Sequence, residues 1–130
     1  MISAAAPDPA WYCVLVVDDD DTVRLLISGV LEDAGYRVVT ARDGVEALEA
    51  WSSQHVDCIV TDVNMPNMNG LELIGKLRGL TTYKFTPILV LTTEMDPGKK
   101  QQAKASGATG WIVKPFDPDT LLATIRKVIG

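Results

Sequence analysis

Residues 14–21 read VLVVDDDD, so four apolar residues run directly into four aspartates. Three later apolar runs also end in a polar side chain: a carboxylate at Asp62, a hydroxyl at Thr92 and an ammonium at Lys114. Short apolar runs rich in Val and Ile are typical of strands buried on both faces of a parallel sheet. Open parallel sheets bind ligands outside the carboxyl ends of their strands. We therefore expect these polar groups to converge at one edge of one sheet.

Helical periodicity separates the apolar runs. Apolar residues between positions 23 and 34 recur at helical spacing, and Gly35 can end that helix in a left-handed conformation. Asp43, Asp96 and Asp117 stand where further helices are expected to begin, and a proline follows the last two. Strand and helix alternate about five times, which predicts one doubly wound α/β domain with a parallel sheet. The predicted strands span residues 14–17, 36–40, 56–61, 88–91 and 110–113.

The composition is that of a folded domain, with 130 residues of which 47% are hydrophobic. A net charge of -5 argues against nucleic acid as a direct partner, because phosphate binding needs clustered Lys and Arg. No apolar stretch approaches the ~18 residues of a membrane span, and the N-terminus lacks the features of a signal peptide. Residues 1–10 are expected to form a flexible tail. Cys13 and Cys58 fall in apolar strand segments and are expected to be buried and reduced, as in a cytoplasmic protein.

Five separated segments of the chain form a recognisable set when taken in order: residues 14–19, 22–24, 59–66 with Asn69 and Gly70, 91–92, and 111–116. Together they resemble the receiver domain of two-component response regulators. The resemblance covers nearly all of the chain after residue 10. Residues 91–94 and 107–118 are similar to stand-alone chemotaxis regulators of the CheY type.

This resemblance implies a flavodoxin-like domain over residues 11–130, with no output domain. The implied sheet has five parallel strands in the order 2-1-3-4-5 and helices on both faces. The resemblance also implies a signalling protein rather than an enzyme, one that promotes its own phosphorylation and dephosphorylation. Its phosphoryl group would come from a histidine kinase of the chemotaxis type, and the acceptor would be Asp62.

The implied cofactor is Mg²⁺. A carboxylate can accept a phosphoryl group as a covalent nucleophile, and two dense anions in one site require a cation. Mg²⁺ prefers oxygen ligands from one or two carboxylates, water and phosphate. The resemblance implies that Asp19, Asp62 and the main-chain carbonyl of Asn64 would be ligands, and that Asp18 would act through water.

The resemblance also implies which side chains would contact the phosphoryl group and which would move in response. Lys114 would neutralise one phosphoryl oxygen and the Thr92 hydroxyl would hydrogen-bond another. Movement of Thr92 would let an aromatic side chain on the last strand turn inward, and Trp111 occupies that position. Chemotaxis regulators usually carry Tyr there, so Trp111 is a departure, and plain packing of a large aromatic is the alternative.

The implied output face consists of the helix over residues 97–106, the strand over 110–113 and the helix over 118–129. Lys99, Lys100 and Lys104 make it locally basic, which suits an acidic partner segment, although a solvated helix face is the commoner explanation. The flagellar switch is the candidate target. We expect a monomer that contacts neither membrane nor nucleic acid.

Two other functions stay open. The same site could serve a phosphate sink or connector without a motor target. Alternatively, Asp18 to Thr22 fits the DxDxT pattern of haloacid-dehalogenase-type phosphatases, with Asp18 as nucleophile and Asp20 as acid/base. That class needs a further acidic pair at a later strand end, which the strand ending at Lys114 does not offer. Asp20 is otherwise read as a solvated or helix-capping residue. The pair Lys114-Pro115 resembles the family's cis peptide.

Overall fold

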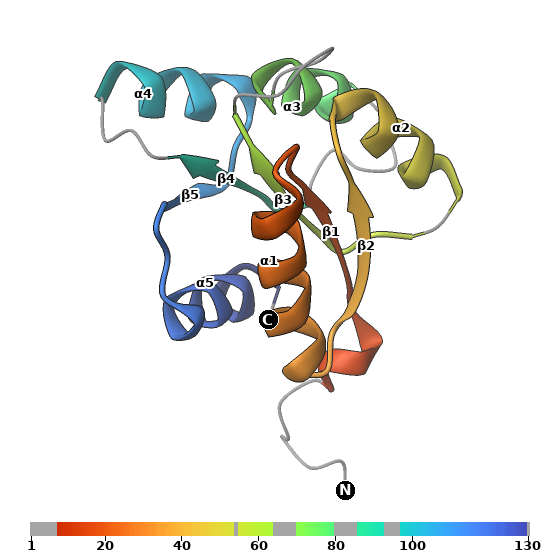
Figure 1. Ribbon diagram of the computed structural model, residues 1–130. Helices are drawn as coiled ribbons and strands as arrows, with labels where there is room; N and C mark the ends of the chain where they lie inside the picture. The colour runs from red at the N-terminus through yellow and green to blue at the C-terminus, as the bar shows by residue number, and fades with distance from the viewer. Residues whose placement is uncertain (1–7, 54, 64–69, 80–85, 93–96, 130) are drawn as a thin grey trace, which may run out of the picture.

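A sheet of five parallel strands lies between two layers of helices (Figure 1). The structure is a computed structural model and describes residues 8–53, 55–63, 70–79, 86–92 and 97–129. The strand order is β2-β1-β3-β4-β5, so the predicted doubly wound α/β fold is confirmed. The elements are η1 (Pro9–Trp11), β1 (Cys13–Val17), α1 (Asp21–Asp33), β2 (Arg37–Ala41), α2 (Gly44–Ser53), β3 (Cys58–Asp62), α3 (Gly70–Arg78), β4 (Ile88–Thr92), α4 (Pro97–Ser106), β5 (Gly110–Val113) and α5 (Pro118–Ile129).

The central strands are apolar throughout because both faces of the sheet are covered. Leu15 and Val17 of β1 pack in one cluster with side chains of α2, α3 and α4. Val14 and Val16 point to the other face and pack with side chains of α1 and α5. Figure 1 shows these two helix layers on opposite sides of the sheet. Burial on both sides explains why the sequence of β1 lacks the alternation of polar and apolar residues seen in half-exposed strands.

Aspartates begin three of the helices, as predicted for Asp43 and Asp117, and Asp20 is a helix cap, one of the two roles left open for it. Oδ1 of Asp20 accepts hydrogen bonds from the backbone N–H groups of Thr22 and Val23, which start α1. Asp43 caps α2 and Asp117 caps α5 in the same manner. Such caps satisfy N–H groups that have no partner within the helix. The predicted cap at Asp96 lies outside the described residues.

Glycines in the left-handed region end α1 and α4. Gly35 has φ +99° and Gly107 has φ +110°. At Gly107 the surroundings are tight as well, because an added Cβ would lie 2.8 Å from Cγ of Arg78. The Arg78 guanidinium donates to the carbonyl oxygens of Gly107 and Thr86. Arg78 therefore joins the end of α3 to the end of α4 and to the segment that enters β4.

Six strand boundaries differ by one or two residues from those predicted, and hydrogen bonds explain the starts of β3 and β2. The predicted third strand began at residue 56, whereas β3 begins at Cys58. The Asp57 carboxylate accepts a hydrogen bond from the Cys13 N–H at 2.8 Å. At this point a side chain therefore takes the place of a backbone carbonyl of the neighbouring strand. The predicted second strand began at Tyr36, but the Tyr36 N–H bonds to the carbonyl of Leu31 and belongs to the end of α1. β2 consequently runs from Arg37 to Ala41.

The N-terminal segment and the cysteines complete the fold. The sequence places a flexible tail up to residue 10; Pro9 and Ala10 belong to η1, and residues 1–7 lie outside the described residues. Cys13 and Cys58 are buried free thiols, as predicted. Burial raises the pKa of Cys58 to about 12. None of the helices in the described ranges has the length and apolar character that crossing a bilayer requires.

Candidate functional site

Three carboxylates meet at the carboxyl edge of the sheet. Asp18 follows β1 and Asp62 ends β3, and the two strands are neighbours with Val17 opposite Thr61. This register brings the two aspartates together. Asp18, Asp19 and Asp62 each offer an oxygen within 4.8 Å of the others. The structure thus gathers the three acidic residues that the sequence analysis selected.

Asp18 is held from several directions although none of its surface is exposed. Its Oδ1 accepts from the Asp20 N–H at 2.9 Å and its Oδ2 accepts from Nζ of Lys114 at 3.0 Å. Its carbonyl oxygen accepts from Nη1 of Arg24 at 2.8 Å. A buried carboxylate is tolerated when it is hydrogen-bonded and paired in this way. Asp19, by contrast, is exposed, so the cluster opens to solvent on that side.

Lys114 reaches the acidic cluster from the end of β5. Its Nζ lies 3.0 Å from Oδ2 of Asp18 and 3.5 Å from Oδ1 of Asp62. Burial lowers the pKa of Lys114, but the hydrogen bond to Asp18 and the negative charges of Asp62 and Asp18 outweigh it, so the pKa lies above its ordinary value. The lysine is therefore an ammonium at neutral pH. Its peptide bond to Pro115 is cis, in agreement with the resemblance.

Asp62 occupies a place that disfavours its ionised form. Burial raises its pKa, the Lys114 charge lowers it, and the Asp18 charge raises it again, so that the net pKa is above the ordinary value. The Val63 N–H donates to Oδ1 of Asp62 at 2.8 Å. The ionised carboxylate is thus incompletely compensated. A further positive charge bound beside Asp62 would stabilise its ionised form.

The cluster has the chemistry of a site for a hard divalent cation. All three potential ligands are carboxylate oxygens, and one of them is exposed while two are buried. Hard cations such as Mg²⁺ prefer oxygen donors, whereas softer metals select sulfur or imidazole. A single ammonium faces the three carboxylates among the described ion pairs, so a cation would also relieve their repulsion. The residues present therefore fit Mg²⁺. Asn64, the predicted carbonyl ligand, lies outside the described residues.

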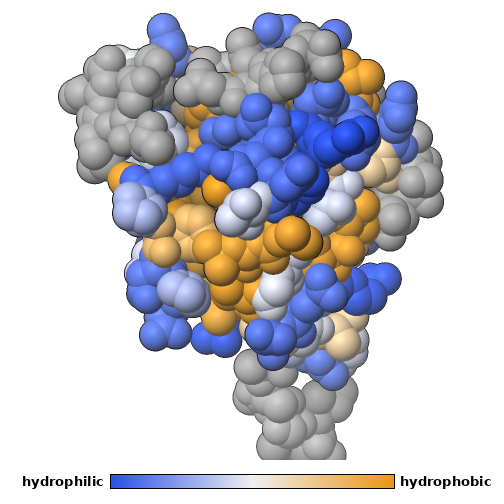
Figure 2. All heavy atoms as spheres, in the orientation of Figure 1, coloured by the Kyte–Doolittle hydropathy of each residue, from blue (hydrophilic) through white to orange (hydrophobic). Residues whose placement is uncertain are grey.

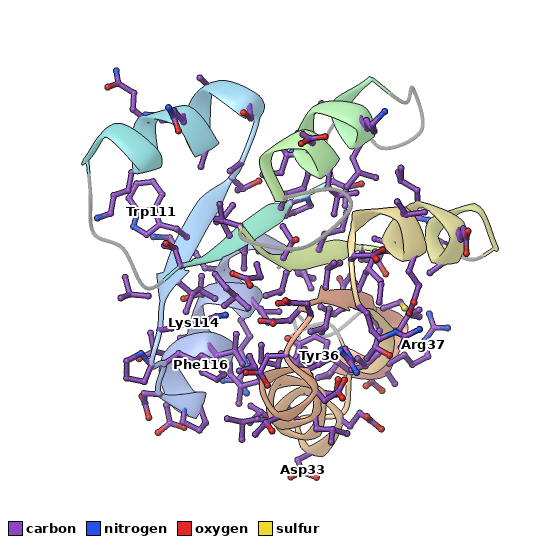
Figure 3. All side chains as sticks on the ribbon, turned by 45° about the horizontal axis from the view of Figure 1, so that its top comes forward. Asp33, Tyr36, Arg37, Trp111, Lys114 and Phe116 are labelled. Carbon is purple, nitrogen blue, oxygen red and sulfur yellow. The ribbon has the colours of Figure 1, made fainter. Side chains whose placement is uncertain are left out.

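Thr92 and Trp111 take different places relative to this cluster. Thr92 ends β4 opposite Val113, and its carbonyl accepts from the Lys114 N–H at 2.8 Å, so it lies at the same sheet edge. Trp111 is 38% exposed, and Nζ of Lys100 lies 4.8 Å from its ring centroid. Figure 3 shows Trp111 beside α4 and away from Lys114. Of the two residues predicted to form the switch, Thr92 therefore lies at the edge that carries the acidic cluster, and Trp111 lies at the surface.

Arg24 is a positioning residue that the sequence did not reveal. Its guanidinium bridges two points of the chain, the Asp18 carbonyl and the Asp21 carboxylate. The spacing of Asp21 and Arg24 on a helix indicates an ion pair, but nothing in the spacing indicates the bond to Asp18. That bond depends on how the turn between β1 and α1 folds. It helps hold the Asp18 backbone where the acidic cluster forms.

The surface around the site is divided by polarity. Figure 2 shows hydrophilic residues in a band across the molecule, directly above an apolar area over α1. Asp19, Asp20 and Asp21 are exposed at the start of α1. Leu25 and Leu26, in the next turn, are exposed at 73% and 53%. The acidic cluster therefore borders an apolar surface.

The chain is similar to known proteins over most of its length. The family described as response regulator receiver domain matches residues 14–126. Chemotaxis protein CheY1 of Helicobacter pylori is 40% identical over 119 residues, which are 90% of this chain and 96% of that protein. The CAI-1 autoinducer sensor kinase/phosphatase CqsS of Vibrio cholerae is 40% identical over 110 residues, which are 84% of this chain and 16% of that protein. The solved structure of the chemotaxis response regulator CheY4 of Vibrio cholerae superposes with a TM-score of 0.87 at 54% identity, covering 90% of this chain and 98% of that one.

Proposed function

Because the chain belongs to the family of response regulator receiver domains, we propose that it accepts a phosphoryl group on Asp62 with the help of bound Mg²⁺. The observation that carries this proposal is the position of the Lys114 ammonium. It lies 3.0 Å from a carboxylate oxygen of Asp18 and 3.5 Å from one of Asp62, inside a cluster of three carboxylates. Catalysis of phosphoryl transfer depends mainly on charged groups held in fixed positions, such as this ammonium.

In the proposed reaction, Asp62 attacks the phosphorus of a phosphohistidine. The two described contacts of its carboxylate, from Val63 and Lys114, both fall on Oδ1, which leaves Oδ2 as the assigned nucleophile. The new bond joins Oδ2 to phosphorus, and the bond between phosphorus and the imidazole nitrogen breaks. The electron pair of that bond stays on the imidazole, which then takes up a proton. The product is an acyl phosphate on Asp62.

The remaining residues have supporting roles in this proposal. Asp19, Asp62 and the Asn64 carbonyl would hold Mg²⁺, which supplies charge neutralisation between carboxylates and phosphoryl oxygens. Both oxygens of Asp18 already accept hydrogen bonds, so Asp18 suits contact through water rather than direct ligation. Lys114 would move its second contact from Asp62 to a phosphoryl oxygen. The Thr92 hydroxyl would bind another phosphoryl oxygen.

The partners follow from the family and from the exposed faces. A histidine kinase of the chemotaxis type would supply the phosphoryl group. The target would bind α4, β5 and α5, where the exposed Lys104 and the half-buried Lys100 suit an acidic segment. The flagellar switch is the candidate target, since relatives of this chain are named chemotaxis proteins. We place this activity in the cytoplasm and assign it to a monomer.

A connector or phosphate-sink role is the second candidate. Trp111 favours it, because the resemblance calls for tyrosine at this position in regulators that act on the motor. The similarity to a segment of a sensor kinase/phosphatase also favours it, since receivers of this type occur within longer signalling proteins. The phosphatase alternative gains no support, because Asp20 caps α1 and the proposed nucleophile, Asp18, has no exposed surface.

Chemical labelling tests the acceptor assignment directly. The protein is incubated with acetyl phosphate and Mg²⁺, and tritiated borohydride then reduces the acyl phosphate, which releases phosphate and leaves tritium on the resulting homoserine. We expect label on Asp62 in the parent and no label in Asp62→Asn. Asp33→Asn is the matched control, because Asp33 is an exposed aspartate of α1 outside the acidic cluster. Undiminished labelling of Asp62→Asn would refute the assignment, and label on Asp18 would favour the phosphatase.

A further inference from the structure

A cation lies over the exposed aromatic side chain of β5. The Nζ of Lys100, on α4, is 4.8 Å from the centroid of the Trp111 ring. An ammonium within about 6 Å of an indole face is attracted by the ring quadrupole, and Trp gives the strongest such contact. Trp111 keeps 38% of its surface exposed in this position. The contact links the middle of α4 to β5 through side chains alone.

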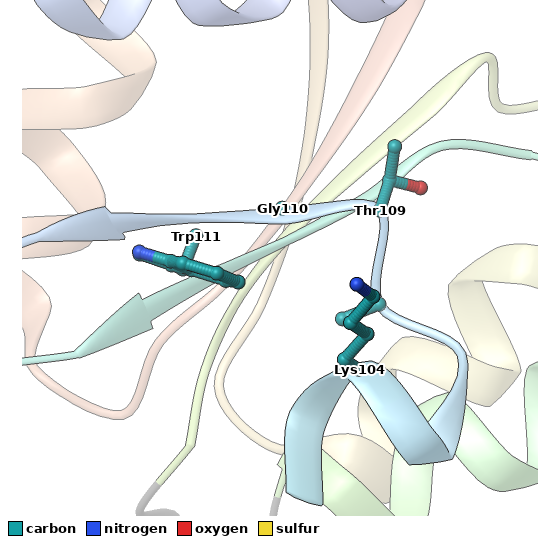
Figure 4. A pocket seen from close by; sticks show the side chains of 5 residues that line it. Lys104, Thr109, Gly110 and Trp111 are labelled. Atoms are coloured by element: carbon teal, nitrogen blue, oxygen red, sulfur yellow. The ribbon is translucent and has the colours of Figure 1, made fainter. Parts of the chain in front are cut away.

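Trp111 also separates two hollows on this surface. The first has a volume of about 370 Å³ and is bordered by Lys104, by residues 108–110 and by Trp111 (Figure 4). The second has a volume of about 380 Å³ and is bordered by Trp111 and by residues of β5 and the start of α5, among them Phe116 and Thr120. Trp111 is the residue that borders both. Its side chain is therefore a partition across the face formed by α4, β5 and α5.

We propose that Lys100 is a positioning residue that holds Trp111 outward as this partition. Release of the contact lets the indole turn toward the sheet, and the two hollows then join into one continuous groove. The inference rests on the proposed function in one respect, since it takes this face as the output surface. In the unphosphorylated protein the Lys100 contact favours the divided surface. It thereby opposes binding of an extended partner segment before phosphorylation.

The size of the effect follows from the nature of the contact. Exposed cation–π contacts change an equilibrium by about two- to fivefold, which corresponds to about 0.5–1 kcal/mol. A change of this size shifts the ratio of outward to inward Trp111 without locking either position. Phosphorylation can then overcome it.

The test follows the position of Trp111 in the unphosphorylated protein without Mg²⁺. Trp11→Phe and Trp51→Phe leave Trp111 as the single tryptophan, and 5-fluorotryptophan incorporation lets ¹⁹F NMR count its positions. Lys100→Met is expected to lower the ratio of outward to inward Trp111 about two- to fivefold. Lys100→Arg keeps a cation over the ring and is expected to restore the parent ratio. Lys104→Met is the matched control, because Lys104 lies on the same helix and borders the first hollow.

Two results would overturn the inference: an unchanged ratio in Lys100→Met, or an equal change in Lys104→Met. Circular dichroism verifies that each variant is folded, and Lys100→Gln replaces Lys100→Met if that variant unfolds. A second measurement, with beryllofluoride as a mimic of the phosphoryl group, distinguishes this inference from the proposed function. If beryllofluoride and Mg²⁺ leave the parent ratio unchanged while Lys100→Met shifts it, the switch role of Trp111 fails and the Lys100 contact stands.

Discussion

The ammonium of Lys114 lies 3.0 Å from Oδ2 of Asp18, a carboxylate with no exposed surface. The two residues are 96 positions apart in the chain, at the ends of β5 and β1. The pair compensates a charge that the interior would otherwise exclude. It also holds the lysine beside Asp62, where a phosphoryl group would arrive. One contact thus serves both the stability of the fold and the arrangement of the site.

Lys114→Met is expected to destabilise the metal-free protein by about 3–5 kcal/mol, because it leaves Asp18 buried without its counter-charge. Urea unfolding in the presence of chelator measures the loss. Lys127→Met is the matched control, since Lys127 is an exposed lysine of α5. A midpoint for Lys114→Met equal to that of the control would contradict the prediction.

Labelling by acetyl phosphate is expected to slow by about 100-fold or more in Lys114→Met, as when one charge-stabilising donor is removed from other active sites. Lys114→Arg is expected to restore little of this rate, because a planar guanidinium cannot reproduce the point contact of an ammonium. The initial rate of label incorporation provides the comparison, with Lys127→Met labelled at the parent rate. Normal labelling of Lys114→Met would remove Lys114 from the mechanism.

Asp62→Asn is expected to stabilise the metal-free protein at pH 7 by on the order of 1 kcal/mol. The amide removes a buried charge that lies beside Asp18 and Asp19. Burial is the main reason that the pKa of Asp62 is raised, so the ionised form is the costly one in the folded state. The parent therefore gains stability as pH falls through this raised pKa. The advantage of Asp62→Asn is expected to shrink by pH 4.

Urea unfolding of the parent and Asp62→Asn at both pH values measures this difference. Added Mg²⁺ is expected to reverse the order at pH 7, because a ligand that binds only the folded state stabilises it by mass action. Asp33→Asn again is the control and is expected to respond to neither Mg²⁺ nor pH in this way. If the parent is already the more stable protein in chelator, the electrostatic account of the site is wrong.

Cys58 is expected to make the fold sensitive to alkali. Burial raises the pKa of its thiol from an ordinary value of 9.0 to about 12. A raised pKa contributes stability that is complete below the unfolded pKa and is lost as pH rises toward the folded one. Between about pH 9 and pH 12 the parent should therefore lose about 1.4 kcal/mol per pH unit relative to Cys58→Val. Unfolding of both proteins at pH 7 and pH 10.5 tests this prediction. The same difference in unfolding free energy at both pH values would contradict it.

Gly107→Ala is expected to cost more stability than Gly35→Ala. Both glycines have φ in the left-handed region, which costs an L-residue roughly 1–2 kcal/mol. Only at Gly107 would the new methyl lie 2.8 Å from a side chain, that of Arg78, whereas at Gly35 the nearest atom is 3.4 Å away. The hydrogen bonds from the Arg78 guanidinium to the carbonyl oxygens of Gly107 and Thr86 oppose its displacement. Thermal unfolding compares the variants, and equal losses would mean that Arg78 moves freely.

The sequence predicted those features whose causes are local in the chain. Helix caps at Asp20, Asp43 and Asp117 depend on residues two or three positions away, and all three are present. The strands followed from short apolar runs, with boundary errors of one or two residues. The errors at the starts of β3 and β2 arose because Asp57 bonds to Cys13 and Tyr36 bonds to Leu31, contacts that hydrophobic periodicity does not encode.

By itself, then, the sequence determined which residues form strands and helices and which polar groups stand at the strand ends. Only the tertiary structure decided that Asp18 has no exposed surface, that Lys114 touches both Asp18 and Asp62, and that Trp111 turns outward beneath a lysine of α4. Element identity depends on neighbours along the chain. Burial and the distances between charges depend on how parallel strands align side by side, which no single segment specifies.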